Sequence, residues 1–87
     1  MAGSDTRLHK MNMAINKEKS IEGRIRMGAA IRSIREKEDL TCEELGERVG
    51  ISRQTVSKIE NGRYAAGADT LSQLADAMGY EWQLIKK

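Results

Sequence analysis

The chain has 87 residues, which is enough for one small domain with a limited hydrophobic core. It contains no proline or phenylalanine and a single cysteine, which suits an aliphatic helical bundle and excludes an internal disulfide. No apolar run approaches the roughly 20 residues that cross a membrane. We therefore expect a cytoplasmic, all-α protein without a signal peptide or a membrane partner.

The net charge of +2 is too small to indicate a nucleic-acid partner, but the charges are unevenly distributed along the chain. Residues 1–35 carry eight basic and three acidic residues, a net +5. Residues 36–49 carry two basic and six acidic residues, a net −4, and residues 50–87 carry five basic and four acidic residues, a net +1. Because phosphates repel carboxylates, the acidic block should point away from any bound DNA.

The first 19 residues show no clear periodicity, so we expect residues 1–19 to form a mostly disordered N-terminal arm. An alternative is a basic arm that wraps around DNA, because phosphate affinity needs only flexible cations. The cations available for that role are Arg7, Lys10, Lys17 and Lys19.

A long helix is predicted from Ser20, a suitable N-cap, to about Lys37. Its apolar residues recur at spacings of three and four, and the stripe from Met27 through Ile34 should lie in the core. After the turn that follows, Leu40 should fill the core. Basic side chains should project from the flanks of the helix, and these are Arg24, Arg26, Arg32 and Arg35.

Residues 41–62 read TCEELGERVGISRQTVSKIENG and predict two short helices joined by a tight turn. Thr41 and Glu44 have the spacing of a capping box at the start of the first helix, and Gly50 suits the left-handed residue that ends it. The inward face of this helix should carry Cys42, Leu45, Gly46 and Val49, and the outward face should carry Glu43, Glu44 and Glu47.

The second helix should begin after Ser52, span residues 53–61 and end at Gly62. At about 100° per residue, Val56 and Ile59 point inward together. The outward side chains can donate hydrogen bonds and include no carboxylate: Gln54, Ser57, Lys58 and Asn61, with Arg53 on the first turn and Thr55 at the boundary. Such residues suit the major groove, where Arg and Lys bind guanine, Gln binds adenine and a Thr methyl contacts thymine. The alternative is an ordinary solvated face.

The whole pattern resembles the Xre-type helix-turn-helix of phage repressors, Cro proteins and many antitoxins. The resemblance covers residues 27–79 and is carried, in order, by MGAAIRSIRE, then LT and EEL one residue apart, then VGISRQTVSKIENG, then TLSQLADAMG. It implies an all-α, lambda-repressor-like bundle of four to five helices in which residues 53–61 form the recognition helix. It also implies double-stranded DNA as the partner, with no cofactor.

The resemblance assigns roles to single residues. It implies base-reading positions at Arg53, Gln54, Thr55 and Lys58. It implies phosphate contacts at Ser52, Ser57, Asn61 and Arg63, the last in a loop that lies along the DNA backbone in the family. Two positions depart from the family, because Cys42 stands where a phosphate-binding Gln is usual and Gly46 stands where Ala is usual.

After that loop, a further helix should start at Gly67 or Asp69 and stop at Gly79. Its apolar face should carry Leu71, Leu74, Ala75 and Met78. The tail, residues 80–87, reads YEWQLIKK and alternates between apolar and polar residues, which predicts a β-strand.

A lone strand in a helical chain lacks backbone hydrogen-bond partners. The simplest partner is the same strand of a second subunit, with Trp82 and Leu84 at the dimer interface. This arrangement is similar to that of some HigA- and HipB-type antitoxins. The alternative is a tail that packs on the core of its own subunit.

These features divide the chain into an arm (1–19), a helix-turn-helix domain (20–79) and a dimerisation strand (80–87). We expect a sequence-specific transcriptional regulator, a repressor that binds a palindromic operator as a homodimer. The alternative is an antitoxin that binds a toxin protein and autoregulates its own operon.

The sequence gives no support for catalysis, and we expect neither an enzyme nor a metal site. The only histidine is His9, in the arm, and the only cysteine is Cys42. We expect Cys42 to be a small residue at a helix start. The alternative is a redox sensor, for which a position at a helix N-terminus would lower the thiol pKa.

Overall fold

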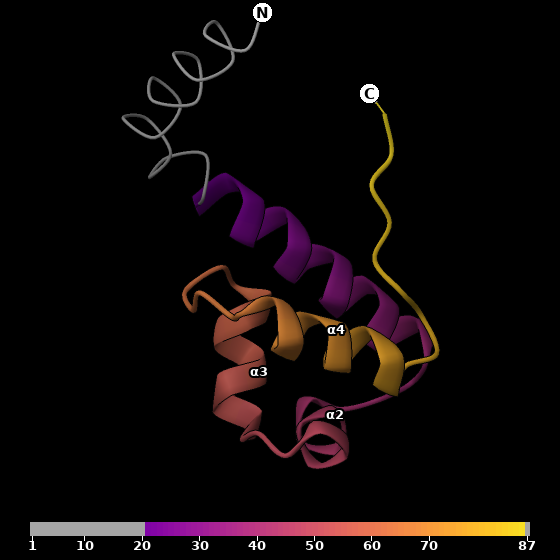
Figure 1. Cartoon of the computed structure of the whole chain (residues 1–87). Helices are drawn as coiled ribbons and strands as arrows, with labels where there is room; N and C mark the ends of the chain where they lie inside the picture. The colour runs from indigo at the N-terminus through magenta and orange to yellow at the C-terminus, as the bar shows by residue number, and fades with distance from the viewer. Residues whose placement is uncertain (1–20, 87) are drawn as a thin grey trace, which may run out of the picture.

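Figure 1 shows the computed structural model of the chain, which describes residues 21–86. The described part is all-α and has four helices: a first described helix over residues 21–37, α2 (Cys42–Val49), α3 (Arg53–Glu60) and α4 (Ala68–Ala77). The expected small helical bundle is therefore confirmed. The expected N-terminal arm and the Ser20 cap lie outside the described residues.

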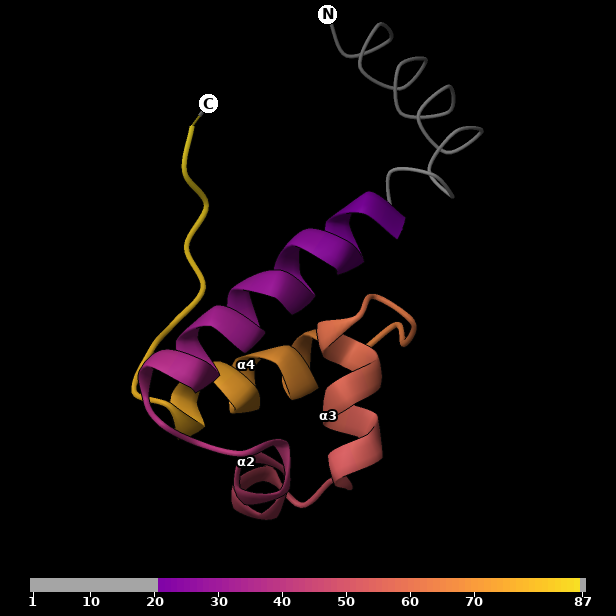
Figure 2. The same ribbon diagram turned by 180° about the vertical axis from the view of Figure 1, so that it is seen from behind.

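The first described helix lies across α4, and α3 stands at one end of this pair (Figure 1). In the view from behind, α2 is again seen nearly end on below α4, while α3 stands upright beside it (Figure 2). The loop that follows α3 extends past its C-terminal end before the chain turns into α4. One side of α3 is thus left facing away from the rest of the bundle.

The core is one cluster to which all four helices contribute. Its buried members are Ile31, Leu45, Val56, Ile59, Leu74 and Met78. Leu40 packs against this cluster, as expected, and so do Ile34, Cys42, Val49 and Leu71. Burial of an aliphatic side chain of this kind stabilises a fold by roughly 1.5–3 kcal/mol, so these contacts fix how the helices pack.

Local signals in the sequence determine where the short helices begin and end. Thr41 and Glu44 form the expected capping box of α2, and Gly50 ends that helix with φ 80°. Ser52 caps α3 through its side chain, as expected. Gly67 is the N-cap of α4, without a side-chain hydrogen bond.

Two glycines allow backbones to approach each other closely. A Cβ atom at Gly46 would lie 2.5 Å from the carbonyl oxygen of Ile51, so α2 contacts the backbone of the turn that leads into α3. A Cβ atom at Gly28 would lie 2.2 Å from the carbonyl oxygen of Ile59, so the first described helix contacts the backbone of α3. These contacts position α3 from both sides.

The C-terminal tail differs from the expected strand. Residues 80–86 have no regular secondary structure in the described single chain, because an extended segment has no neighbouring strand to bond within it. The tail is instead attached to its own subunit. The Tyr80 hydroxyl donates to Glu38 Oε2 over 3.2 Å, and the Trp82 Nε1–H donates to the Leu71 carbonyl oxygen over 2.9 Å.

The end of the tail runs away from the helices (Figures 1 and 2). Leu84 and Ile85 are 105% and 82% exposed. Within residues 21–86, no helix is both long and apolar enough to cross a membrane.

Candidate nucleic-acid interface

The outward face of α3 has the composition expected from the sequence. Its exposed residues are Arg53, Gln54, Ser57 and Lys58, followed by Asn61 just after the helix, while Thr55 is half-buried. Val56 and Ile59 are buried, as predicted. The helix therefore presents polar and basic side chains on one side and packs against the core with the other.

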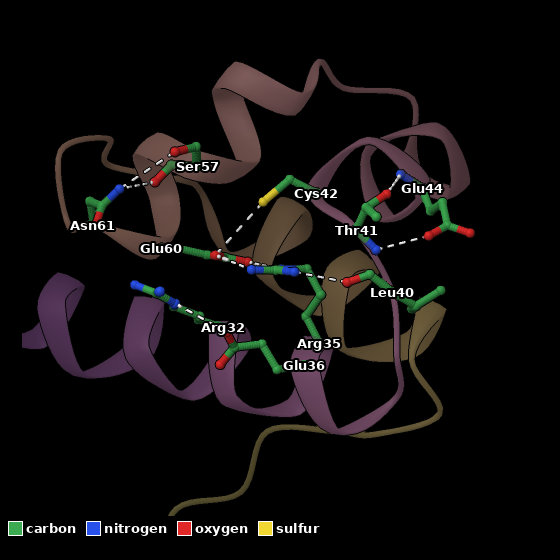
Figure 3. A network of polar contacts seen from close by, with 10 residues as sticks. All are labelled: Arg32, Arg35, Glu36, Leu40, Thr41, Cys42, Glu44, Ser57, Glu60 and Asn61. Atoms are coloured by element: carbon green, nitrogen blue, oxygen red, sulfur yellow. Dashed lines mark hydrogen bonds and ion pairs between the residues drawn. The ribbon is translucent and has the colours of Figure 1, made fainter.

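The single carboxylate of α3 is turned inward. Glu60 is 8% exposed, and its two carboxylate oxygens accept from the Arg35 guanidinium, with Nε–Oε2 at 2.6 Å and Nη2–Oε1 at 3.1 Å (Figure 3). Arg35 Nη1 also donates to the carbonyl oxygen of Leu40 over 2.8 Å. This pairing leaves the exposed face of α3 with positive charges and no negative one.

The Arg35–Glu60 pair joins the first described helix to the C-terminal end of α3. We expected Arg35 to project from the flank of its helix, and the structure shows this to be wrong, because its guanidinium is paired with Glu60 and its side chain is only 13% exposed. The sequence signal was Glu60 itself, which lies four residues after the inward Val56. A carboxylate on an inward helical face costs free energy unless a cation or hydrogen-bond donors pair with it.

The pair also favours the charged form of Arg35. The hydrogen bond from Arg35 to Glu60, together with the attraction of the carboxylate, raises the pKa of the guanidinium above its usual value, although burial opposes this. A second ion pair nearby is exposed to solvent. Arg32 Nε lies 3.6 Å from Glu36 Oε2, and both side chains are 58% exposed. Arg32 is thus engaged on the surface of its own helix.

Cys42 lies beside this ion pair, with Sγ 3.9 Å from Glu60 Oε1 (Figure 3). Burial of the thiol, followed by the negative charge of Glu60, raises its pKa. Neither burial nor the Glu60 carboxylate favours the thiolate, which is the reactive form that the redox-sensor alternative requires. Cys42 is a small residue at the start of α2, packed against the core.

The expected phosphate-binding residues fall into two groups. Ser52 lies at the N-terminal end of α3, whereas Ser57 lies in its C-terminal half and Asn61 and Arg63 follow the helix. Asn61 Nδ2 donates to the carbonyl oxygen of Ser57 over 2.9 Å and lies 3.5 Å from Ser57 Oγ. The amide of Asn61 is thus held along the helix.

Other predicted residues lie away from this face. The exposed carboxylates of α2 are Glu43, Glu44 and Glu47, and none of these is on α3. Trp82 and Leu84 belong to the tail, which leaves from the end of α4 farther from α3 (Figures 1 and 2). Within residues 21–86, no group of three His, Cys, Asp or Glu side chains could hold a metal ion.

A helix with a basic, carboxylate-free outer face, preceded by a second helix and a tight turn, defines a helix-turn-helix DNA-binding protein. The family described as "Helix-turn-helix" matches residues 31–85. The chain belongs to this family, the Xre/Cro type recognised in the sequence. It is a DNA-binding transcriptional regulator rather than an enzyme, as expected.

Curated relatives agree with this assignment. An uncharacterised helix-turn-helix transcriptional regulator of Methanothermobacter thermautotrophicus is 44% identical over 55 residues, covering 63% of this chain and 80% of the relative. The ImmF control region 10 kDa protein of Bacillus phage phi105 is 34% identical over 61 residues, covering 70% of this chain and 68% of the relative. A regulator of Mycobacterium tuberculosis is 41% identical over 51 residues, covering 59% of this chain and 36% of the relative. No solved structure matches the chain significantly.

Proposed function

We propose that the protein is a repressor that binds a palindromic DNA operator as a homodimer. The observation that carries this proposal is the exposed face of α3, which has two cations and no carboxylate because Glu60 is turned inward. Family membership supports DNA as the ligand. A protein that binds genomic DNA in this way would act in the cytoplasm.

In this proposal, α3 enters the major groove and its exposed side chains read bases. Arg53 and Lys58 are suited to guanine and Gln54 to adenine. Thr55 is half-buried at the edge of the exposed face and is also proposed to contact a base. The proposed phosphate contacts are Ser52, Ser57, Asn61 and Arg63. They would hold the helix in register, whereas the base contacts would select the sequence.

A dimer is proposed because one α3 helix reads too few base pairs to define a genomic site. Two such helices about 34 Å apart would read half-sites separated by one turn of DNA. The tail offers the contact between subunits: Trp82 anchors it to α4, and the following Leu84 and Ile85 are exposed. Antiparallel pairing of two tails would satisfy their backbone groups and bring the Leu84 side chains of the two subunits together on one face of the two-stranded ribbon.

Repression would follow from occupancy of a promoter, which requires no ligand. The ImmF control region 10 kDa protein of Bacillus phage phi105 is a similarly small relative, since this chain has a mass of 9.7 kDa. A domain of this size can therefore serve in a control region.

The test is fluorescence anisotropy with the duplex upstream of the protein's own gene, beside a scrambled duplex, over a series of salt concentrations. We expect tight binding of two subunits to the native duplex, with an affinity that falls as salt displaces the basic contacts. Equal, weak binding to both duplexes would overturn the proposal. The search would then turn to a protein partner, such as the toxin of the alternative hypothesis.

A further inference from the structure

The turn that ends α3 packs against the N-terminal half of the first described helix (Figures 1 and 2). Gly62 has φ 71°, and the backbone N–H of Arg63 donates to the Lys58 carbonyl oxygen over 2.8 Å. A Cβ atom at Gly62 would lie 2.7 Å from Ile25 Cγ1 and 3.2 Å from Ile25 Cα. Because Arg63 follows Gly62 and Arg24 precedes Ile25, this contact brings two arginines to the same end of α3.

Arg24 lies on the side of its helix that faces α3. Eleven residues of α-helix make three turns and about 20°, so Arg24 and Arg35 share one face and lie roughly 16 Å apart along the axis. From this face, Arg35 reaches Glu60 at the C-terminal end of α3. Gly28, between the two arginines, lies against the carbonyl oxygen of Ile59. Arg24 is therefore placed beyond the end of α3, beside the loop that follows it.

The loop packs against Arg24 directly. Arg24 and Tyr64 both line a small cavity of about 20 Å³, whose walls also include Ile59 of α3 and Leu71 of α4. Arg24 is half-buried, as expected for a side chain whose aliphatic stem packs on its neighbours while its guanidinium keeps contact with water. Arg63, on the loop, is exposed.

Neither arginine has an ionic partner in the described part of the chain. Arg24 and Arg63 take part in neither of the two ion pairs found within residues 21–86. The carboxylate of Glu60 is already paired with Arg35. Glu22 is two residues before Arg24, so it lies about 160° away around the helix. Two cations thus meet at this end of α3, an arrangement that attracts an anion.

We propose that Arg24 and Arg63 form a phosphate clamp, in which the first described helix adds a DNA-backbone contact at the C-terminal end of α3. A guanidinium can donate two parallel hydrogen bonds to phosphate oxygens. The inference rests on the proposed function, in which Arg63 already contacts a phosphate, and adds Arg24 as its partner. Arg24 precedes residues 31–85, the region that the helix-turn-helix family matches.

The test uses the full chain and a duplex that the wild-type protein selects from a randomised pool, called the selected duplex. Each phosphate contact contributes about 0.9 to the slope of log affinity against log salt concentration. Arg24→Gln should therefore flatten this slope by about 0.9 for each bound subunit. Because phosphates carry no sequence information, the variant should discriminate between the selected duplex and its single-base-pair variants as well as the wild type does.

The matched control is Arg26→Gln, which removes the same charge from the same helix. Arg26 is exposed and lies about 160° around the helix from Arg24, so this variant should keep the wild-type slope. Arg24→Lys keeps the charge and should also keep the slope. A wild-type slope in Arg24→Gln, or equal flattening in Arg26→Gln, would overturn the proposal. Thermal melting followed by circular dichroism checks that the variants are folded.

Uncharged phosphates locate the contact. Each phosphate of the selected duplex is replaced in turn by a methylphosphonate, which has no negative charge. At one position in each half-site, the replacement should weaken binding of the wild type more than that of Arg24→Gln, because the variant has already lost one cation of the clamp. Equal losses at every position would refute the clamp.

The two proposals fail in different ways. If the wild-type protein selects no sequence from the pool, the proposed function fails together with this inference. If it selects a sequence and Arg24→Gln binds that duplex with the wild-type salt slope, the inference alone fails.

Discussion

Arg35 donates to both carboxylate oxygens of Glu60 across 25 residues of sequence, and the two side chains are only 13% and 5% exposed. The pair ties the C-terminal end of α3 to the first described helix. Because both charges are largely removed from water, removing one would leave the other without a partner in a medium of low polarity. The fold should therefore depend on this pair more than on any exposed one.

Replacing Glu60 with Gln should lower the free energy of unfolding by about 3 kcal/mol, because the Arg35 charge would lose its counter-ion. Urea denaturation followed by circular dichroism measures this change. The matched control is Glu36→Gln, which breaks the exposed Arg32–Glu36 pair and should cost less than about 1 kcal/mol. Equal effects of the two changes would contradict the importance assigned to the buried pair.

Replacing Gly28 with Ala should destabilise the protein by about 1–3 kcal/mol, because the new Cβ would lie 2.2 Å from the carbonyl oxygen of Ile59 and force the helices apart. Gly23→Ala, on the same helix, is the control, since nothing lies within 4 Å of its Cβ position. That change should stabilise the helix by about 0.5–1 kcal/mol. Thermal melting compares the two variants with the wild type. If both melting temperatures shift in the same direction, the close contact at Gly28 is refuted.

The capping box of α2 predicts a dependence of stability on pH. The Thr41 backbone N–H donates to Glu44 and lowers the pKa of its carboxyl group in the folded protein. This contribution is present above the unfolded pKa of about 4.3 and is lost as the pH falls through the lower folded value. Between pH 7 and pH 3, Glu44→Gln should thus lose less stability than the wild type. The matched control is Glu43→Gln, next to the cap but outside it, which leaves both hydrogen bonds of the capping box in place.

The base-reading proposal predicts the effects of two alanine substitutions. Gln54→Ala and Lys58→Ala should each weaken binding to the selected duplex by about 1–3 kcal/mol, because each would remove a base contact. Gln73→Ala is the control, since Gln73 is an exposed glutamine on α4 rather than α3. Anisotropy measures all three affinities, and unchanged binding in both α3 variants would end the assignment of α3 as the recognition helix.

The dimer proposal is best tested at Leu84, because Trp82 packs on its own subunit and its loss would also disturb α4. Leu84 is fully exposed in the single chain, so Leu84→Asp should leave the subunit folded. Paired tails would place the two aspartates in an apolar contact, and sedimentation should show monomers. Gln83→Asp changes the adjacent exposed residue and should remain dimeric. A dimer in Leu84→Asp would refute pairing through the tail.

The sequence predicted the short helices well because their signals are local. The Thr41 and Ser52 caps and the terminal Gly50 were all correct, and α3 ends at Glu60, one residue before the predicted end. Periodicity also identified which side of α3 is buried. The base-reading and phosphate roles of the exposed residues stay predictions.

Long-range pairing was less predictable. The partner of Glu60 is 25 residues away, and helical periodicity alone does not say which of several arginines reaches it. The tail shows the same limit, because alternation of apolar and polar residues describes an extended segment but not what it bonds to. Tyr80 and Trp82 bond within the subunit, and their partners Glu38 and Leu71 are distant in sequence.

The residues that anchor α3 are different from the residues that it exposes. Val56, Ile59 and Glu60 hold the helix in place, while Arg53, Gln54 and Lys58 make no contribution to the core. Mutation can therefore change the exposed residues with little loss of stability. A lineage of such proteins could acquire new target sites through a few substitutions on one surface, while the scaffold that presents them is inherited unchanged.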